Sequence, residues 1–255
     1  MGLLRSFLDC AIKSVARNDG INRFMKYFVA NWKANKDLEE AETWINILDN
    51  KLLFDSKIQS QLLADQLKII IAPPFPFLAY FLNLISQFKK QHPYYKNINL
   101  ASQDVSQFNE GSYTGEVTAK TLEGLVNYVI IGHSERRTLF NETNEIIRKK
   151  VEMAKKYNIE PVLCVRNKED IATRKVNFIT YEPVQAIGTG NNESLDNILK
   201  VKKELNLSEK TSFFYGGSVN QANIKTYLTS DEIKGFIVGT ASLNPEDFFN
   251  IISQS

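Results

Sequence analysis

Three side chains suited to proton transfer stand at the ends of short apolar runs that are typical of buried strands. The strings Asn31–Lys33, Gly132–Arg137 and Tyr181–Pro183 place a lysine, a histidine and a glutamate there. A carboxylate can take a proton from carbon, while an imidazole and an ammonium group can stabilise the negative charge left on oxygen. Each alone is more often a surface or packing residue. If the three meet, they predict acid–base chemistry next to a carbonyl.

Glycine-rich turns follow three of the later apolar runs, at Ala186–Gly190, Gly216–Ser218 and Gly239–Thr240. Glycine permits positive φ angles and close approach of the backbone, so such turns can direct N–H groups at an anion. They could also be plain turns. With a phosphate fixed there, proton transfer next to a carbonyl becomes the isomerisation of a small aldose or ketose phosphate.

The elements that must position these residues alternate between short β-branched or aromatic runs and longer amphipathic segments. This alternation predicts parallel strands joined by helices. Eight strands are expected, at Tyr27–Lys33, Leu67–Ala72, Ile98–Asp104, Tyr128–Gly132, Ile159–Val165, Asn177–Tyr181, Thr211–Tyr215 and Gly235–Val238. A doubly wound open sheet is the rival fold, but the turn after the first run lacks the glycines typical of it. We therefore expect an α/β fold with a single (β/α)8 barrel, whose reactive residues lie at the carboxyl ends of its strands.

Two helices of this barrel have clear start signals. Asp37 and Glu40 have the spacing of a capping box before a helix with apolar residues on one face, and Asn244 and Pro245 are a good N-cap and first helical residue for the last helix.

Composition excludes several classes of function. The chain has 255 residues, of which 31 are basic and 29 acidic, and a net charge of +2 gives no reason to expect binding to nucleic acid or to a membrane surface. No apolar run reaches the roughly 20 residues of a membrane-spanning helix. Cys10 and Cys164 stand far apart and beside no histidine at a metal-ligand spacing, which argues against a disulfide framework or a zinc site and fits the cytoplasm.

The reactive strings, together with Gly111–Val117, resemble those of the triosephosphate isomerase family in their order and in their places on the strands. The resemblance covers residues 25 to about 253. Five such strings in one order do not agree by chance, although any one alone would be a weak signal. The resemblance implies a TIM barrel that interconverts dihydroxyacetone phosphate and glyceraldehyde 3-phosphate in glycolysis and gluconeogenesis, with no cofactor and no metal.

The resemblance also assigns roles to matching positions. Glu182 would move the proton between carbons 1 and 2 and His133 would polarise the carbonyl, a pairing for which triosephosphate isomerase is the standard example. Lys33 would stabilise the developing charge. The substrate-binding positions would be Asn31, Lys33, Gly188, Ser218, Gly239 and Thr240, and the supporting ones Ser134 and Glu135. Residues 183 to 190 would form a lid that excludes water.

The sequence departs from the family pattern at the lid and at the fifth crossover. Gln185 stands where the family usually has tryptophan in the first hinge of the lid. Only 17 residues separate Cys164 from Glu182, so Arg166–Ala172 leaves room for about two turns of a shortened fifth helix. Thr240 replaces a glycine found in many relatives, which matters little because the phosphate needs only its backbone N–H.

Residues 1–24 form an extension outside the resemblance. Apolar residues at helical spacing predict an amphipathic helix there, unless Met25 is the natural start. In the family the third loop inserts into a neighbouring subunit, so the loop from Gln103 to Glu116, with Thr114 near its tip, predicts a homodimer.

Two alternatives stay open. The chain could be a catalytically impaired homologue that acts as a binding or structural protein, or an isomerase for a different sugar phosphate on the same fold.

Overall fold

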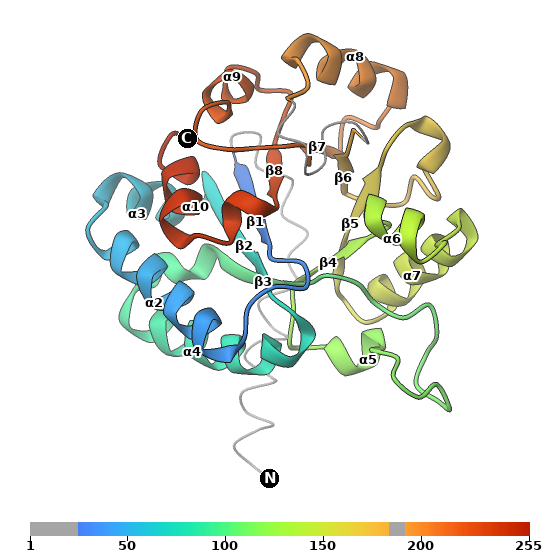
Figure 1. Cartoon of the computed structure of the whole chain (residues 1–255), viewed down its shortest axis with the longest axis horizontal. Coiled ribbons are helices and arrows are strands. Elements are labelled where there is room, and N and C mark those ends of the chain that lie inside the picture. The colour runs from blue at the N-terminus through green and yellow to red at the C-terminus, as the bar shows by residue number, and fades with distance from the viewer. Residues whose placement is uncertain (1–24, 184–191) are drawn as a thin grey trace.

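Eight parallel strands close into a barrel in which each strand pairs with its neighbours in the sequence and β1 pairs with β8 (Figure 1). The computed structural model describes residues 25–183 and 192–255. The strands are β1 Lys26–Asn31, β2 Leu67–Ala72, β3 Ile98–Ser102, β4 Tyr128–Ile131, β5 Glu160–Val165, β6 Phe178–Tyr181, β7 Ser212–Tyr215 and β8 Gly235–Val238. The predicted (β/α)8 fold and all eight strands are confirmed.

Helices form an outer ring around the strands (Figure 1). The α-helices of the described residues are α2 Leu38–Leu53, α3 Ser56–Leu63, α4 Leu78–Gln91, α5 Ala119–Leu122, α6 Ser134–Leu139, α7 Asn144–Lys156, α8 Leu195–Leu205, α9 Ile224–Leu228 and α10 Pro245–Ile252. Short 3-10 turns lie at η1 Phe75–Phe77, η2 Pro93–Asn97, η3 Lys168–Asp170 and η4 Thr240–Ser242. The capping box of Asp37 with Glu40 and the N-cap Asn244 are confirmed.

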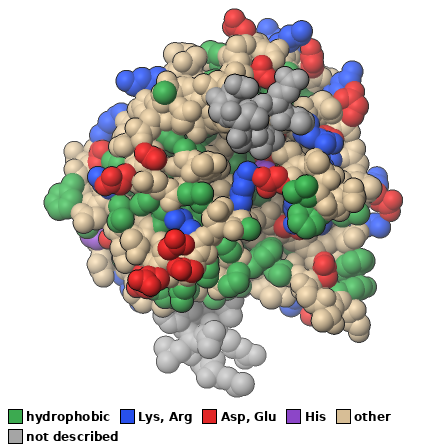
Figure 2. Space-filling model, in the orientation of Figure 1, with side chains coloured by type: hydrophobic (Ala, Val, Ile, Leu, Met, Phe, Trp, Pro, Cys, Tyr) green, Lys and Arg blue, Asp and Glu red, His purple; other side chains and the backbone are tan. Residues whose placement is uncertain are grey.

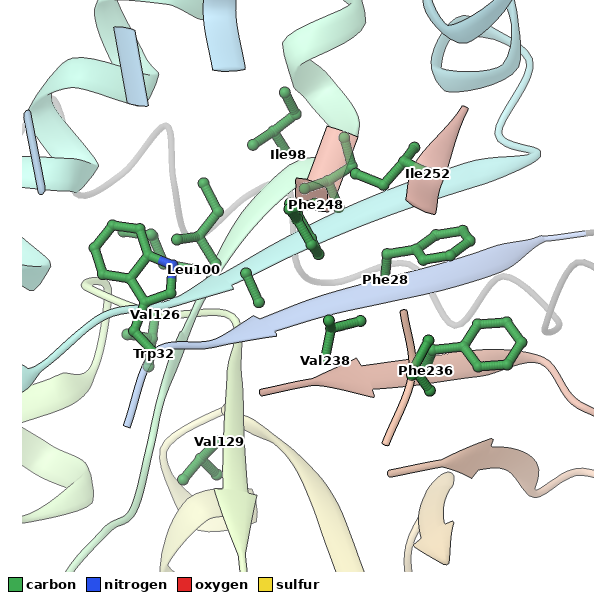
Figure 3. Packing of buried hydrophobic residues seen from close by; sticks show 14 of the residues in the cluster. Phe28, Trp32, Ile98, Leu100, Val126, Val129, Phe236, Val238, Phe248 and Ile252 are labelled. Atoms are coloured by element: carbon green, nitrogen blue, oxygen red, sulfur yellow. The ribbon is translucent and has the colours of Figure 1, made fainter. Parts of the chain in front are cut away.

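The core has two layers because successive side chains of a strand point to opposite faces. In β1, Tyr27 and Val29 belong to the cluster inside the barrel, whereas Phe28 and Ala30 belong to the cluster between strands and helices. Figure 3 shows part of this outer layer, where Phe28 of β1 lies near Phe236 of β8, with ring centroids 5.5 Å apart. The same alternation places the residue that follows each strand either inside the mouth of the barrel or outside it.

The fifth crossover is even shorter than the two turns expected from the sequence. Between β5 and β6 the chain forms only the three-residue turn η3, and a segment without regular secondary structure, with bends at Arg174 and Asn177, then leads into β6. Asp170 folds back onto Arg166, accepting hydrogen bonds from its backbone N–H and its guanidinium. The chain therefore reverses direction where a helix would have continued.

Two predicted features lie outside the described residues. They are the helix within residues 1–24, and the lid with Gln185 and the phosphate-binding Gly188. Within the described parts of the chain, no helix has the length and apolar character needed to cross a membrane.

Candidate active site

Glu182 lies at the mouth of the barrel, just past the end of β6. Phe178 belongs to the interior cluster, so alternation along β6 also directs Thr180 and Glu182 inward. The Glu182 side chain is 1% exposed, and its Oε2 accepts a hydrogen bond of 2.8 Å from the backbone N–H of Ser134. A carboxylate held through one oxygen keeps the other available to receive a proton.

The second oxygen, Oε1, faces His133. It lies 3.3 Å from Nε2 of the imidazole but is not aligned for a hydrogen bond, and no nitrogen or hydroxyl group of the described residues donates one to it. The Cys164 thiol lies beside the same carboxylate, and burial together with the charge of Glu182 raises the pKa of that thiol far above its ordinary value. Cys164 therefore stays protonated next to the carboxylate.

His133 is the N-cap of α6, and this role fixes its ring. Its Nδ1 accepts a hydrogen bond of 3.3 Å from the backbone N–H of Glu135. When one ring nitrogen of an uncharged imidazole accepts, the other carries the proton, so Nε2 becomes the donor. The fold thus directs an N–H group of a buried imidazole toward the same space as Oε1 of Glu182.

Lys33 reaches this space from β1. The strand ends at Asn31, two residues earlier than predicted, because Lys33 adopts the left-handed conformation with φ 53°. Its ammonium Nζ lies 2.6 Å from Oε1 of Glu135, and a Cβ placed on Gly239 would lie 3.6 Å from its Cε. The lysine side chain therefore lies between the loop after β4 and the turn after β8.

The turns after β7 and β8 lie side by side, because these two strands pair. Ser218 follows β7, Gly239 follows β8, and Thr240 opens the 3-10 turn η4. A Cβ on Gly217 would lie 2.1 Å from the hydroxyl oxygen of Tyr215, so this turn needs glycine for steric reasons. In the orientation of Figure 2, basic and acidic side chains gather near the centre of this face.

Comparison with known proteins identifies the family to which this chain belongs. The sequence model described as triosephosphate isomerase matches residues 26–255. Triosephosphate isomerases of Mesomycoplasma hyopneumoniae (strain 7448) and Dictyoglomus thermophilum are each 36% identical to the chain; the first alignment covers 90% of this chain and 99% of the relative, and the second 89% and 98%. The enzyme of Aquifex aeolicus is 33% identical, over 89% of this chain and 98% of its own. The chain belongs to the triosephosphate isomerase family.

The structure brings most of the site residues expected for this family to one end of the barrel. Glu182, His133 and Ser134 are in direct contact, and Lys33 joins them through Glu135. The Asn31 side chain accepts a hydrogen bond of 3.3 Å from the backbone N–H of Lys33. Ser218, Gly239 and Thr240 follow neighbouring strands at this same end.

Two contacts at the site were not predicted, although Gly216 stood in a turn named as a possible anion site and Gln103 at the start of the third loop. Nε2 of Gln103 donates to the carbonyl oxygens of Lys33 and Ala72, and Gly216 lies against the side chain of Glu182. Gln103 follows β3 at the predicted catalytic end, which was the only available signal. The sequence marked Gly216 as part of a turn that could bind an anion, but nothing in it placed this glycine against Glu182.

Arg137 supports the site from outside the barrel. Its guanidinium donates to the carbonyl oxygens of Gly132, Cys164 and Asp170, and its Nη1 lies 3.4 Å from a carboxylate oxygen of Asp170. Burial lowers the pKa of Arg137, although the carboxylate of Asp170 opposes this. In the triosephosphate isomerase fold of this chain, the guanidinium thus joins the ends of β4 and β5 to the short fifth crossover.

The described residues hold no group of three or more His, Cys, Asp or Glu side chains placed to bind a metal ion.

Proposed function

We propose that the mouth of this barrel interconverts dihydroxyacetone phosphate and glyceraldehyde 3-phosphate, with Glu182 as the base, His133 as the hydrogen-bond donor to the substrate oxygens and Lys33 as the stabilising cation. The observation that carries the proposal is the buried Glu182 carboxylate, held by the backbone of Ser134 through one oxygen and placed 3.3 Å from Nε2 of His133 through the other. The reaction moves a proton between neighbouring carbons and is redox-neutral, so these side chains suffice.

The proposed reaction runs through an enediolate. Glu182 removes a proton from carbon 1 of the ketose while Nε2 of His133 donates a hydrogen bond to the carbonyl oxygen on carbon 2. The ammonium group of Lys33 stabilises the negative charge that develops on oxygen. Glu182 then returns the proton to carbon 2, and the imidazole serves the exchange of a proton between the two oxygens.

The substrate phosphate is proposed to bind at the turns after β7 and β8. Ser218, Gly239 and Thr240 would offer backbone N–H groups, joined by Gly188 from the lid. Asn31 would help to fix Lys33, since its side chain accepts from the Lys33 backbone. Ser134 and Glu135 are proposed as supporting residues that hold Glu182 and Lys33 before substrate binds.

Steady-state isomerisation of glyceraldehyde 3-phosphate by the natural chain and by Glu182→Asp tests the proposal. Aspartate keeps the charge but withdraws the carboxylate by one methylene group, so we expect kcat to fall by about a hundredfold or more. Glu160→Asp is the matched control, because Glu160 begins β5 at the opposite end of the barrel. That variant should stay within about twofold of the natural kcat, since it lies far from the reacting atoms.

A folded natural chain without isomerase activity would overturn the proposal and favour the binding-protein alternative. That alternative leaves unexplained why a carboxylate, an imidazole and an ammonium group converge on one space.

We further propose that the chain acts as a homodimer in the cytoplasm. Support for the dimer comes from the loop after β3, where the rings of Phe108 and Tyr113 stack 4.2 Å apart while both stay more than one third exposed. Leu139 and Phe140, in the segment after β4, are 70% and 63% exposed. Such apolar side chains near one end of a barrel are suited to covering by a second copy.

The proposal of a cytoplasmic location is supported by the unpaired, buried thiol of Cys164.

A further inference from the structure

The backbone of Lys33 is held by a side chain from a different strand. Nε2 of Gln103 lies 2.9 Å from the carbonyl oxygen of Lys33 and 2.9 Å from that of Ala72. Carbonyl oxygens only accept hydrogen bonds, so the amide group that faces both must be the NH2. Gln103 directly follows β3, and its two partners follow β1 and end β2. One side chain thus joins the ends of three neighbouring strands.

This hydrogen bond acts on an unfavourable backbone conformation. Lys33 has φ 53°, in the left-handed region that residues with a Cβ seldom adopt. On the N-terminal side, its N–H donates to Oδ1 of Asn31 at 3.3 Å. On the C-terminal side, its carbonyl accepts from Gln103. The conformation is therefore held by side-chain hydrogen bonds at both peptide groups of the residue.

The direction of the Lys33 side chain depends on this conformation. With the observed backbone, Nζ reaches Oε1 of Glu135 at 2.6 Å and Cε lies next to Gly239. A return of φ to the negative values that lysine prefers would rotate the Cα–Cβ bond and carry the ammonium group away from both neighbours. Loss of the Gln103 hydrogen bond removes one of the restraints against that rotation.

We propose that Gln103 is a positioning residue for the isomerisation, whose amide holds the Lys33 backbone in the conformation that directs the ammonium group at the substrate. The inference rests on the proposed role of Lys33. It gives the loop after β3 a function within its own subunit, separate from any role of that loop in assembly.

Gln103→Met tests the inference, because methionine has a similar length and no N–H group to donate. We expect kcat/KM to fall about tenfold, since a small misplacement of a catalytic group has effects of this order. The matched control is Gln59→Met. Nε2 of Gln59 also donates to two carbonyl oxygens, those of Leu52 and Leu53, but at the C-terminal end of α2, which lies at the opposite end of the barrel. Both variants should lose similar thermal stability, and only Gln103→Met should lose activity.

A double-mutant cycle with Lys33→Met distinguishes positioning from a general structural effect. If Gln103 acts through Lys33, Gln103→Met should change kcat/KM about tenfold in the natural background and less than about twofold when Lys33 is already methionine. The slow variants are assayed at high enzyme concentration. The same four proteins are titrated with inorganic phosphate, which gives the cycle a readout independent of turnover: Gln103→Met should weaken phosphate binding only where Lys33 is present.

Two results would overturn the inference alone: equal effects of Gln103→Met in both backgrounds, or the same kcat/KM for Gln103→Met and Gln59→Met. Failure of the proposed function has a different signature: either the folded natural chain has no isomerase activity, or Lys33→Met and Glu182→Asp keep its full activity. Activity per chain is compared at several protein concentrations, so that dissociation of a dimer would be recognised as a dependence on concentration.

Discussion

At the scale of single residues, the position of Glu182 depends on a neighbour that has no side chain. A Cβ placed on Gly216 would lie 2.8 Å from Cγ2 of Thr180 and 3.0 Å from Cγ of Glu182. Thr180 is fully buried and belongs to a strand, so it cannot move aside. The glutamate side chain would have to yield instead, and with it the hydrogen bond from the backbone of Ser134.

Gly216→Ala is therefore expected to act on catalysis more than on folding. We expect kcat to fall at least about tenfold, because the added methyl group displaces the carboxylate. Gly235→Ala is the control, because Gly235 begins β8 at the end of the barrel far from the mouth. A Cβ on Gly235 would lie 2.6 Å from Cε1 of Phe214 in the neighbouring strand β7. Overpacking should cost each variant about 1–3 kcal/mol in the free energy of unfolding. Equal kcat values for the two variants, measured beside urea unfolding, would contradict this explanation.

The motifs around Lys33, His133 and Glu182 and their places at strand ends predicted that these side chains meet, because residues that follow the strands of a barrel share its mouth. Sequence position alone predicted no contact of Gln103 with Lys33 and none of Gly216 with Glu182. Their importance lies in contacts with residues distant in the sequence, and a single sequence carries no record of those contacts. The left-handed conformation of Lys33 was also invisible, since lysine has no intrinsic preference for it.

At the scale of elements, the fifth crossover replaces a helix with a polar cluster. Asp170 accepts from the backbone N–H of Arg166 at 2.9 Å and from its guanidinium at 2.7 and 3.0 Å. The guanidinium of Arg137 contacts both the carboxylate and the carbonyl oxygen of Asp170. The Asn144 amide donates to the carbonyl of Glu169, which ties the turn to α7. These contacts hold the short crossover against α7 and, through Arg137, against the ends of β4 and β5.

Asp170→Asn should destabilise the protein in a pH-dependent way. Burial alone would raise the pKa of Asp170, but the hydrogen bonds from Arg166 and the nearby charges outweigh it and lower the pKa below its ordinary value. A carboxyl group with a lowered folded-state pKa contributes its stability above its unfolded pKa, about 3.9, and loses it as the pH falls through the folded pKa. At pH 7 we expect a loss of about 3 kcal/mol in the free energy of unfolding.

Urea unfolding between pH 7 and pH 3 measures this effect. The difference from the natural chain should stay constant down to about pH 5 and shrink below about pH 4. The neighbouring Glu169→Gln is the control, because that side chain is 67% exposed and lies 3.9 Å from Lys168. It should change stability by less than about 1 kcal/mol at any pH. A loss for Asp170→Asn that does not vary with pH would exclude the carboxylate charge as its cause.

Element order was predictable because hydrophobic periodicity and helix-cap signals both act locally in the sequence. The capping box of Asp37 with Glu40 and the N-cap Asn244 are two such local signals. The length of the fifth crossover alone predicted a shortened helix. That the segment forms only a three-residue turn depends on Asp170 folding back to Arg166 and Arg137, which is a tertiary effect. Local patterns of residues 166–172 favour more helix than the folded chain contains.

At the scale of the whole molecule, a closed barrel leaves no strand edge for association, so any assembly must use side chains of its loops and helices. The exposed aromatic pair of Phe108 and Tyr113 belongs to the loop that begins at Gln103, whose amide holds the backbone of Lys33. Phe54, at the end of α2, is also exposed, at 86%, but it stands apart from the mouth loops. The aromatic pair of the loop after β3 and Phe54 therefore make different predictions for association.

Tyr113→Asp should dissociate the proposed dimer, whereas Phe54→Asp should not. Burial of an aromatic side chain at the centre of an interface contributes about 2 kcal/mol or more, and a buried unpaired carboxylate adds a further cost, so the dissociation constant should rise at least about thirtyfold. Sedimentation velocity over a dilution series measures it: the natural chain and Phe54→Asp should sediment at twice the chain mass of 29.1 kDa, and Tyr113→Asp at the mass of one chain. A natural chain that is monomeric at every concentration would exclude the dimer. If only Phe54→Asp dissociates, the interface lies instead on the surface formed by α2 and α3, and the loop after β3 would keep only its contact with Lys33.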